Sequence, residues 1–255
     1  MNSLRHFIPP ARSLGLAAIL LLTLLLAACT VPAVVITPTP TPVVGDWDKI
    51  QQTGTLVVGT SADYPPFDSR FRVTGFDPEL ARALGEELGL EIQIKDIPFD
   101  GLTGAIQAGQ IDAAIGAISV TPERDALLDF TDIYYVSEDA FLAKADAPLT
   151  SLGSLEEVEE QALVGVQQGS VYQSWAEREL VDKGVLPESN LLLYSDVTRA
   201  VDDLKRGRIN LVIMDAISAE TFAQDGEVKI VAQGLNRQRY AVALPDGAND
   251  LRRNL

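Results

Sequence analysis

The feature that most constrains the fold is a helix-to-strand unit that occurs twice. Residues 102–118 read LTGAIQAGQIDAAIGAI, and residues 200–217 read AVDDLKRGRINLVIMDAI. Each has the apolar spacing of an amphipathic helix, then a glycine that ends the helix (Gly109 or Gly207), one further residue and an apolar strand. Since each half of the chain owns one such unit, two α/β lobes are the simplest arrangement.

The first half opens with a strand–helix–strand pattern. Residues 55–60 (TLVVGT) are apolar and partly β-branched, and residues 91–97 alternate between apolar and polar. Between them, residues 77–88 have helical spacing, with Asp77 as the candidate N-terminal cap and Gly89 at the end. This order predicts parallel strands covered by helices.

Two further segments are predicted to connect the lobes. Residues 139–144 (DAFLAK) leave the first lobe, and residues 240–244 (YAVAL) return from the second. Two antiparallel connections at one edge make a hinge with a cleft opposite. Ligands of open α/β sheets lie at the carboxyl ends of strands, which places the cleft against residues 117–119 and Asp215. The predicted boundaries are lobe 1 at 46–142, lobe 2 at 143–238, and a return to lobe 1 at 239–255.

The N-terminus has the pattern of an export signal. Arg5 and Arg12 precede an apolar run at residues 14–26, which is short for a membrane span and typical of a signal-peptide core. The run ends in Leu-Ala-Ala-Cys29, which resembles the bacterial lipoprotein signal, so residues 1–28 are expected to be removed and Cys29 lipidated. An ordinary signal peptide with an incidental cysteine is the alternative. A Thr/Pro-rich spacer at residues 29–45 follows.

Composition excludes several classes of function. The formal net charge of −16 disfavours binding to nucleic acid. The chain has one cysteine and one histidine, Cys29 and His6, and both lie in the N-terminal segment. We therefore expect no Ser-His-Asp or Cys-His catalysis, no histidine or cysteine metal site, no internal disulfide and no cofactor.

Five motifs follow one another through most of residues 53–245: TLVVGTSADYPPF (55–67), GFDPELARAL (75–84), FDGLTGAIQAGQIDAAIGAISVTPER (99–124), LDFTDIYY (128–135) and GRINLVIMD (207–215). Together they resemble the periplasmic amino-acid-binding proteins of ATP-driven import systems, family 3 of the solute-binding proteins. The resemblance implies an α/β, two-lobed periplasmic-binding-protein fold, each lobe a mostly parallel sheet flanked by helices, joined by two hinge strands. It also implies a non-enzymatic role.

The resemblance implies roles for the polar residues of the motifs. Arg124 matches the arginine that clamps the α-carboxylate of the ligand, which suits a planar guanidinium with two parallel donors. Asp215 matches the carboxylate that receives the α-ammonium group. Ser119 matches a residue that contacts the main-chain groups of the ligand, with the carbonyl of Ala117 beside it.

Further matches concern the second lobe and the ligand side chain. Ser170 and Val171 match the position that offers backbone N–H groups to the carboxylate at a helix start. Tyr64 and Phe67 match aromatic residues that pack over the ligand side chain. Ser61 stands where relatives that bind cationic ligands, and some that bind glutamine, carry an acid. This disfavours lysine, arginine or histidine as the ligand and leaves a neutral polar ligand open; the expected ligand is a polar amino acid.

Each assignment has a structural alternative. Arg124 could cap a helix or pair with Asp125 or Asp129, and Asp215 could be a turn former. Ser170 could be only a helix cap, and Tyr64 and Phe67 could be plain core residues.

The expected function is capture of an amino acid and delivery to permease subunits of an ABC importer, by a monomer held outside the cytoplasm by its lipid. A ligand-sensing module for a receptor, or a dehydratase on the same fold, are the alternatives. The family normally continues for one or two helices beyond Leu255, so a missing C-terminal part is also expected.

Overall fold

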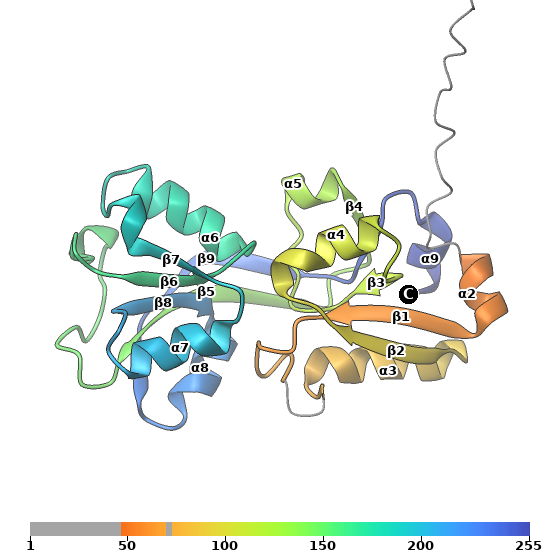
Figure 1. The fold of residues 1–255 in the computed structure, drawn as a ribbon, viewed down its shortest axis with the longest axis horizontal. Coiled ribbons are helices and arrows are strands. Elements are labelled where there is room, and N and C mark those ends of the chain that lie inside the picture. Colours follow the sequence, from red (N-terminus) through yellow and green to blue (C-terminus); the bar gives the residue numbers. More distant parts are fainter. Residues whose placement is uncertain (1–46, 70–72) are drawn as a thin grey trace, which may run out of the picture. The chain divides into compact units, whose positions relative to one another are not determined.

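The computed structural model describes residues 47–69 and 73–255, which all fall within one compact unit, Pro42–Leu255. The predictions for the signal peptide, Cys29 and most of the spacer lie outside the described residues. Within this unit the strands form two separate five-stranded sheets, shown in Figure 1. No helix among the described residues is long and apolar enough to cross a membrane.

The first sheet has the strand order β2-β1-β3-β10-β4. Its strands are β1 (Thr55–Thr60), β2 (Glu91–Asp96), β3 (Ala113–Ala114), β4 (Leu128–Phe130) and β10 (Ala243–Pro245). The helices beside it are α2 (Trp47–Thr53), α3 (Phe76–Leu88), α4 (Leu102–Gln107), α5 (Pro122–Asp125) and α9 (Asn249–Asn254), with a 3-10 turn at Phe99–Gly101.

Alternation along β1 explains why helices cover both faces of this sheet. Val58 packs in one apolar cluster with Ile50 of α2 and Ala81 of α3, whereas Val57 packs against a second cluster that contains Leu102 and Ile106 of α4. Successive residues of a strand point to opposite faces, so one strand serves both clusters. The first lobe is therefore a three-layered α/β unit.

The second sheet has the strand order β7-β6-β8-β5-β9. Its strands are β5 (Tyr135–Lys144), β6 (Val164–Gln167), β7 (Leu191–Tyr194), β8 (Leu211–Asp215) and β9 (Val228–Tyr240). Its helices are α6 (Val171–Ala176), which continues as a π-helical turn at Glu177–Val181, α7 (Val197–Lys205) and α8 (Ala216–Ala223), with 3-10 turns at Leu155–Glu157 and Glu188–Asn190.

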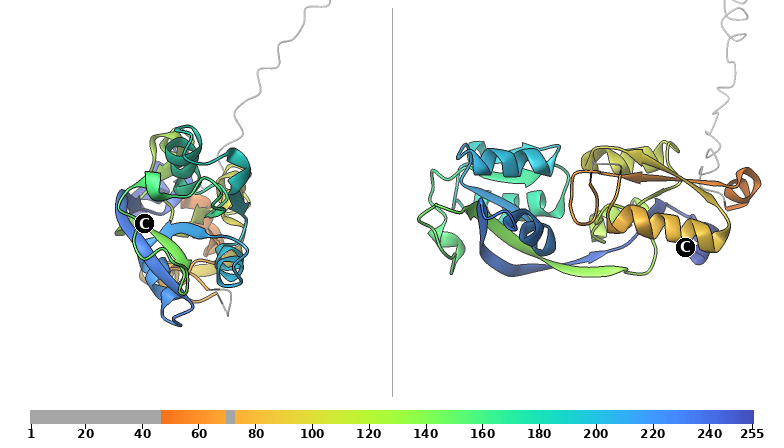
Figure 2. Two further views of the ribbon diagram at one scale, coloured as in Figure 1. Left: turned by 90° about the vertical axis from the view of Figure 1, so that its left-hand side faces the viewer. Right: turned by 90° about the horizontal axis from the view of Figure 1, so that it is seen from below.

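Both sheets are mixed, which refines the expectation of mostly parallel sheets. β1 is parallel to β2 and β3, and β6 is parallel to β7 and β8. β10 is antiparallel to β3 and β4 in the first sheet, and β5 is antiparallel to β8 and β9 in the second. β5 and β9 pair along nearly their whole length and extend side by side from the second sheet toward the first (Figure 2).

The crossing point differs from the prediction. Residues 139–143 were expected to leave lobe 1, but they pair with β8 from Asp139↔Asp215 to Ala143↔Leu211. These residues already belong to the second sheet, because Ala140 to Ala143 are buried in its core. The predicted lobe boundary at residue 142 is therefore too late. The return lies where expected, between the end of β9 at Tyr240 and β10.

The repeated helix-to-strand unit is present, with one difference between its copies. Gly109 and Gly207 end their helices at φ 64° and 69°, the left-handed region that glycine adopts without strain. The second copy leads into the five residues of β8. The strand expected across 111–118 is regular only at Ala113–Ala114 in β3, since the backbone turns and reaches φ 50° at Ala117.

Candidate ligand-binding site

Residues from both lobes enclose a small cavity where the carboxyl ends of the parallel strands face each other. Its volume is about 10 Å³, roughly the space of one water molecule. Its lining comes from the first lobe, the second lobe and the returning strand β9: Tyr64, Phe99, Gly116, Ala117, Ser119, Arg124, Gln167, Ser170, Val171, Tyr172 and Tyr240. Most of the predicted site residues are thus together; Ser61, Phe67 and Asp215 lie close by, outside the lining.

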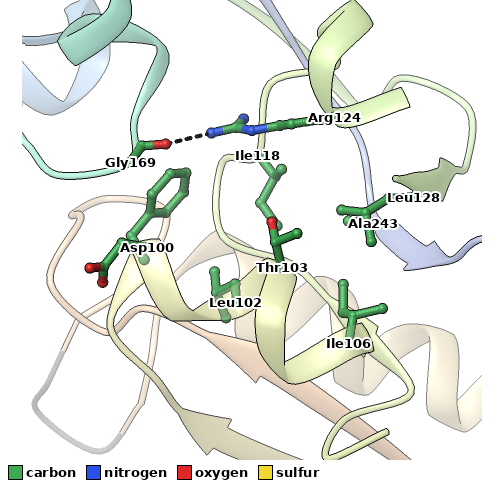
Figure 3. A pocket seen from close by; sticks show the side chains of 10 residues that line it. Asp100, Leu102, Thr103, Ile106, Ile118, Arg124, Leu128, Gly169 and Ala243 are labelled. Atoms are coloured by element: carbon green, nitrogen blue, oxygen red, sulfur yellow. Dashed lines mark hydrogen bonds between the residues drawn. The ribbon is translucent and has the colours of Figure 1, made fainter. Parts of the chain in front are cut away.

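Arg124 lies on a short helix whose start the sequence explains. Thr121 is its cap and accepts the N–H of Arg124 at 3.3 Å, and Pro122 occupies the first turn. The guanidinium donates to the carbonyl oxygen of Ser119 at 2.8 Å and to that of Gly169 in the other lobe at 3.0 Å. The second bond is drawn in Figure 3.

The surroundings of Arg124 are apolar rather than acidic. The guanidinium carbon lies 5.3 Å from the centre of the Phe99 ring. Burial lowers the pKa of Arg124 to about 10, so the side chain is still a cation at neutral pH. The expected alternative partner Asp129 instead accepts the N–H of Gly247 and lies 3.9 Å from Arg252. No ion pair among the described residues involves Arg124.

Asp215 ends β8 and is 0% exposed. One carboxylate oxygen accepts the N–H groups of Ile217 at 2.9 Å and Ser218 at 3.3 Å, which caps helix α8. The other accepts the hydroxyl of Tyr240 at 2.6 Å. Asp215 is thus both a cap and a buried acid at the cleft, and burial raises its pKa.

Three tyrosines join Asp215 to the cavity, and sequence reasoning identified only Tyr64. The hydroxyl of Tyr64 accepts the backbone N–H of Asp215 at 2.8 Å. The hydroxyls of Tyr172 and Tyr240 lie 3.0 Å apart. Burial raises the pKa of all three tyrosines well above the ordinary value, so they remain neutral hydrogen-bonding groups.

Phe67 does not line the cavity, contrary to its predicted place over the ligand side chain. Its ring packs edge-on against Tyr135 at 5.3 Å and Tyr240 at 5.4 Å, in the aromatic core behind Tyr64. The aromatic wall of the cavity is Phe99 instead, from the 3-10 turn before α4. The FDG segment belongs to one of the five motifs, but nothing in its spacing predicts that its aromatic ring lines the cavity.

Ser170 caps helix α6, as its structural alternative predicted. Its hydroxyl accepts the N–H of Gln173 at 3.2 Å and donates to the carbonyl of Gln167 at 2.6 Å. The same residue and its neighbour Val171 line the cavity. Ser170 therefore both caps the helix and forms part of the cavity wall.

Ser61 is buried and directs its hydroxyl to a neighbour that sequence reasoning passed over. The hydroxyl donates to Asp63 at 2.6 Å. The Asp63 carboxylate also reaches the second lobe, where it accepts the N–H of Val197 at 2.7 Å and lies 3.3 and 3.4 Å from Nε2 of Gln167. Asp63 therefore sits between the lobes, next to a residue of the cavity wall.

Asp77 supports the cavity from behind rather than capping α3. The cap of that helix is Gly75, with no side-chain hydrogen bond. The Asp77 carboxylate accepts the N–H of Ala117 at 2.8 Å, and the hydroxyl of Tyr134 accepts the same N–H at 3.2 Å. Asp77 is 0% exposed and burial raises its pKa to about 7. This network holds Ala117 in its left-handed conformation.

Two other cavities adjoin the site through Arg124. One, of about 60 Å³, lies between Arg124 and the apolar side chains of α4 and is shown in Figure 3. The other is a groove of about 530 Å³ between α5, α6 and β9, lined in part by Arg178, Arg237 and Glu123. Among the described residues, no group of three or more acidic, histidine or cysteine side chains could hold a metal ion.

Comparison with known proteins identifies the family. Residues 56–238 match the bacterial extracellular solute-binding proteins, family 3. The chain belongs to this family. That family is the one indicated by the motifs, and its description agrees with the expected location outside the cytoplasm.

Relatives of this family-3 chain are named as binding proteins. The arginine-binding extracellular protein ArtP of Bacillus subtilis is 32% identical over 68% of the chain, and the match spans 65% of that protein. The L-cystine-binding protein TcyJ of Escherichia coli is 28% identical over 80% of the chain and 76% of that protein. These names agree with the expected non-enzymatic role.

Solved structures confirm the two-lobed fold. Holo ArgBP from T. maritima superposes with a TM-score of 0.73 at 28% identity, covering 81% of this chain and 89% of that one. An ancestral arginine-binding protein bound to arginine gives a TM-score of 0.71 at 31% identity, covering 79% and 88%. The periplasmic-binding-protein fold predicted from the motifs is therefore correct.

Proposed function

We propose that this protein captures an amino acid between its lobes and delivers it to the permease subunits of an ABC importer. The observation that carries the proposal is Arg124. Its half-buried guanidinium lines a cavity shared by both lobes and is bonded to carbonyl oxygens. A carboxylate is the partner that a buried guanidinium binds best, with two parallel charged hydrogen bonds.

The rest of the cavity wall suits the other end of a zwitterion. Asp215 supplies a negative charge. Its carboxylate accepts a hydrogen bond from the hydroxyl of Tyr240, which lines the cavity. The carbonyl of Ala117 and the hydroxyl of Ser119 are the groups expected beside the α-ammonium. Ser170 and Val171 are expected to offer their N–H groups to the carboxylate. Paired in this way, neither ligand charge is buried alone.

Capture in this cavity requires the lobes to move apart, because the volume of the cavity is about 10 Å³. Arg124, Ser119 and Ala117 belong to one lobe, and Asp215, Ser170 and Val171 to the other. A zwitterion that binds both sets stabilises the closed form relative to the open one, which is the differential affinity that closure needs.

Delivery and anchoring complete the proposal. Arginine is the first ligand to test, since several relatives carry that name. Lipidation of Cys29 would hold a monomer at the outer surface of the membrane, with the Thr/Pro-rich segment as spacer. A sensor that presents its closed form to a receptor is the second candidate, and reconstitution with permease and ATPase subunits separates the two.

A thermal-unfolding screen of the full chain against the twenty amino acids tests the proposal. A ligand at a hundred times its dissociation constant stabilises by about 2.7 kcal/mol, or roughly 5–10 °C for a domain of this size. Arg124→Ala is expected to keep its own unfolding transition and lose the ligand shift. No shift with any amino acid, or an undiminished shift in the variant, would contradict the proposal.

A further inference from the structure

The acid that supplies the negative charge of the site lies behind the cavity wall. Asp215 is 0% exposed and is outside the lining of the cavity, whereas Tyr240 is part of that lining. The Tyr240 hydroxyl donates to the Asp215 carboxylate at 2.6 Å. A positive group in the cavity therefore meets the hydroxyl of Tyr240 before it meets the carboxylate of Asp215.

The backbone places Tyr240 beside the groups expected at the ligand ammonium. Tyr240 ends β9 and forms an antiparallel bridge with Ser119, and the next N–H, of Ala241, donates to the carbonyl of Ile118 at 3.1 Å. Tyr240 also pairs with Tyr135 of β5, and the two rings stack with their centroids 6.1 Å apart. The ring of Tyr240 is 1% exposed and is thus held in place by its neighbours.

The hydrogen bonds of the Tyr240 hydroxyl have a definite direction. Its single proton goes to Asp215, because a carboxylate accepts hydrogen bonds and cannot donate them. The hydroxyl of Tyr172 lies 3.0 Å from that of Tyr240, so Tyr172 is the donor in this pair. The oxygen of Tyr240 thus accepts a proton from a neutral group of the cavity wall. Since its own proton points to an anion, this oxygen is a stronger acceptor than that of an isolated phenol.

We propose that the Tyr240 hydroxyl is the direct acceptor of the ligand α-ammonium group, which replaces the Tyr172 hydroxyl there, and that Asp215 acts through it. The proposal rests on the proposed function and adds a ligand-contact residue to it. The exchange of donors is favourable because a charged donor makes a stronger hydrogen bond than a neutral one. One hydroxyl group then separates the buried ammonium from the opposite charge of Asp215, so neither charge is buried alone.

Tyr240 and Tyr172 consequently have different roles, although their hydroxyls are neighbours. Tyr240→Phe removes a hydrogen bond that the ligand makes, which raises the free energy of the bound state. Tyr172→Phe removes a hydrogen bond that the ligand replaces, which raises the free energy of the ligand-free closed form instead. Each substitution keeps the ring and removes one oxygen atom, so the two variants can be compared directly.

The experiment is calorimetric titration of the full chain with arginine and with des-amino arginine, which carries a hydrogen in place of the α-ammonium group. Tyr240→Phe is expected to lower the affinity for arginine by at least about 10-fold. The affinity of this variant for des-amino arginine should change by less than about threefold, because that molecule has no ammonium to offer the hydroxyl. Tyr172→Phe should leave the affinity for arginine unchanged or raise it.

Tyr135→Phe is the matched control. It removes a hydroxyl from the ring stacked on Tyr240, and Tyr135 does not line the cavity. Both affinities should therefore stay as they are in the unsubstituted chain. If arginine gives no heat, the amino acid with the largest thermal shift and its own des-amino analogue take the place of the two probes.

Three results would overturn the proposal while the proposed function stands. They are an unchanged arginine affinity in Tyr240→Phe, an equal loss of affinity for both probes in that variant, and a loss in Tyr172→Phe as large as that in Tyr240→Phe. If Tyr240→Phe does not fold, Tyr172→Phe decides, since a loss of about 10-fold or more there contradicts the exchange of donors. Binding of no amino acid by the unsubstituted chain would remove the proposed function itself.

Discussion

The two copies of the helix-to-strand unit reach the same cleft and end there differently. In the second copy, β8 runs straight to Asp215, whose carboxylate is placed by the strand and by the helix that it caps. In the first, β3 is short and the chain turns through Ala117, whose N–H is held by the distant Asp77. One copy ends in a charged side chain, whereas the other ends in backbone groups that a buried acid holds.

The difference teaches that a buried carboxylate at the cleft need not be a ligand group. Asp215 and Asp77 are both 0% exposed, Asp215 at the end of β8 and Asp77 in the first turn of α3. Only their hydrogen-bond partners distinguish the two carboxylates. Variants at the two positions should therefore differ in how much ligand affinity and stability they lose.

The largest effect is expected at Asp215. Asp215→Ala removes the α8 cap and the acceptor of the Tyr240 hydroxyl, which should lower the free energy of unfolding by about 2–4 kcal/mol. Amino-acid binding should fall by at least about 100-fold, because the ammonium would be buried without its partner. Urea unfolding and calorimetric titration measure the two losses separately. Asp215→Ala that binds normally would remove the assignment.

A smaller effect on binding is expected at Asp77, since it acts through Ala117. Asp77→Ala should weaken binding about 10-fold, and Asp77→Asn should restore most of it, because its amide oxygen can accept the Ala117 N–H. The comparison is the affinity ratio of the two variants at equal folded fraction. Equal affinities of Asp77→Ala and Asp77→Asn would show that the hydrogen bond to Ala117 does not affect ligand binding.

The comparison also predicts a pH dependence of stability. Burial raises the pKa of Asp77 to about 7 and that of Asp68 to about 6, from an ordinary 3.8. The folded chain then binds more protons than the unfolded chain between about pH 4 and 7, so the free energy of unfolding falls as pH rises through that window, by on the order of 1–3 kcal/mol.

Urea unfolding at several pH values from about 5 to 7.5 measures this slope. The surface acids whose pKa is lowered, such as Glu123 and Asp225, titrate below this range. Asp77→Asn should flatten the profile, because it removes the buried carboxyl group. A stability that rises with pH through this window would contradict the role given to burial.

The smallest effect on stability is expected at the glycine that ends the helix in each copy of the unit. Gly109→Ala and Gly207→Ala each force a side chain into the left-handed region, at a cost of about 1 kcal/mol. The two losses should be similar, and ligand affinity should not change. Thermal unfolding with and without ligand measures both. Unequal losses of stability would show that the two helix ends differ, although their φ angles are similar.

The sequence was sufficient for features that depend on neighbouring residues. Two kinds of feature follow from local spacing and were predicted: the glycine helix ends at Gly89, Gly109 and Gly207, and the strand–helix–strand opening. The motif resemblance predicted that Arg124 lies at the ligand site. It did not predict the hydrogen bond between Arg124 and Gly169.

Features that depend on distant pairings could not be predicted. Asp77 lies 40 residues from the N–H that it accepts, and Asp63 lies 134 residues from Val197. Asp77 was interpreted as a cap because it precedes a proline in a helix start, which is the stronger local signal. Phe67 lies in the aromatic core and Phe99 lines the cavity, because the direction of a ring beside a turn depends on tertiary packing.

Several hydrogen bonds between the lobes are made by residues in or beside the cavity. Arg124 holds Gly169, Asp63 holds Val197, and Tyr64 holds the N–H of Asp215. Uptake is therefore an exchange reaction, in which the ligand replaces bonds that the protein makes with itself. The measured affinity is the difference between the two sets, reduced by the fraction of molecules that are closed without ligand. Weakening a lobe contact that the ligand replaces would consequently tighten binding.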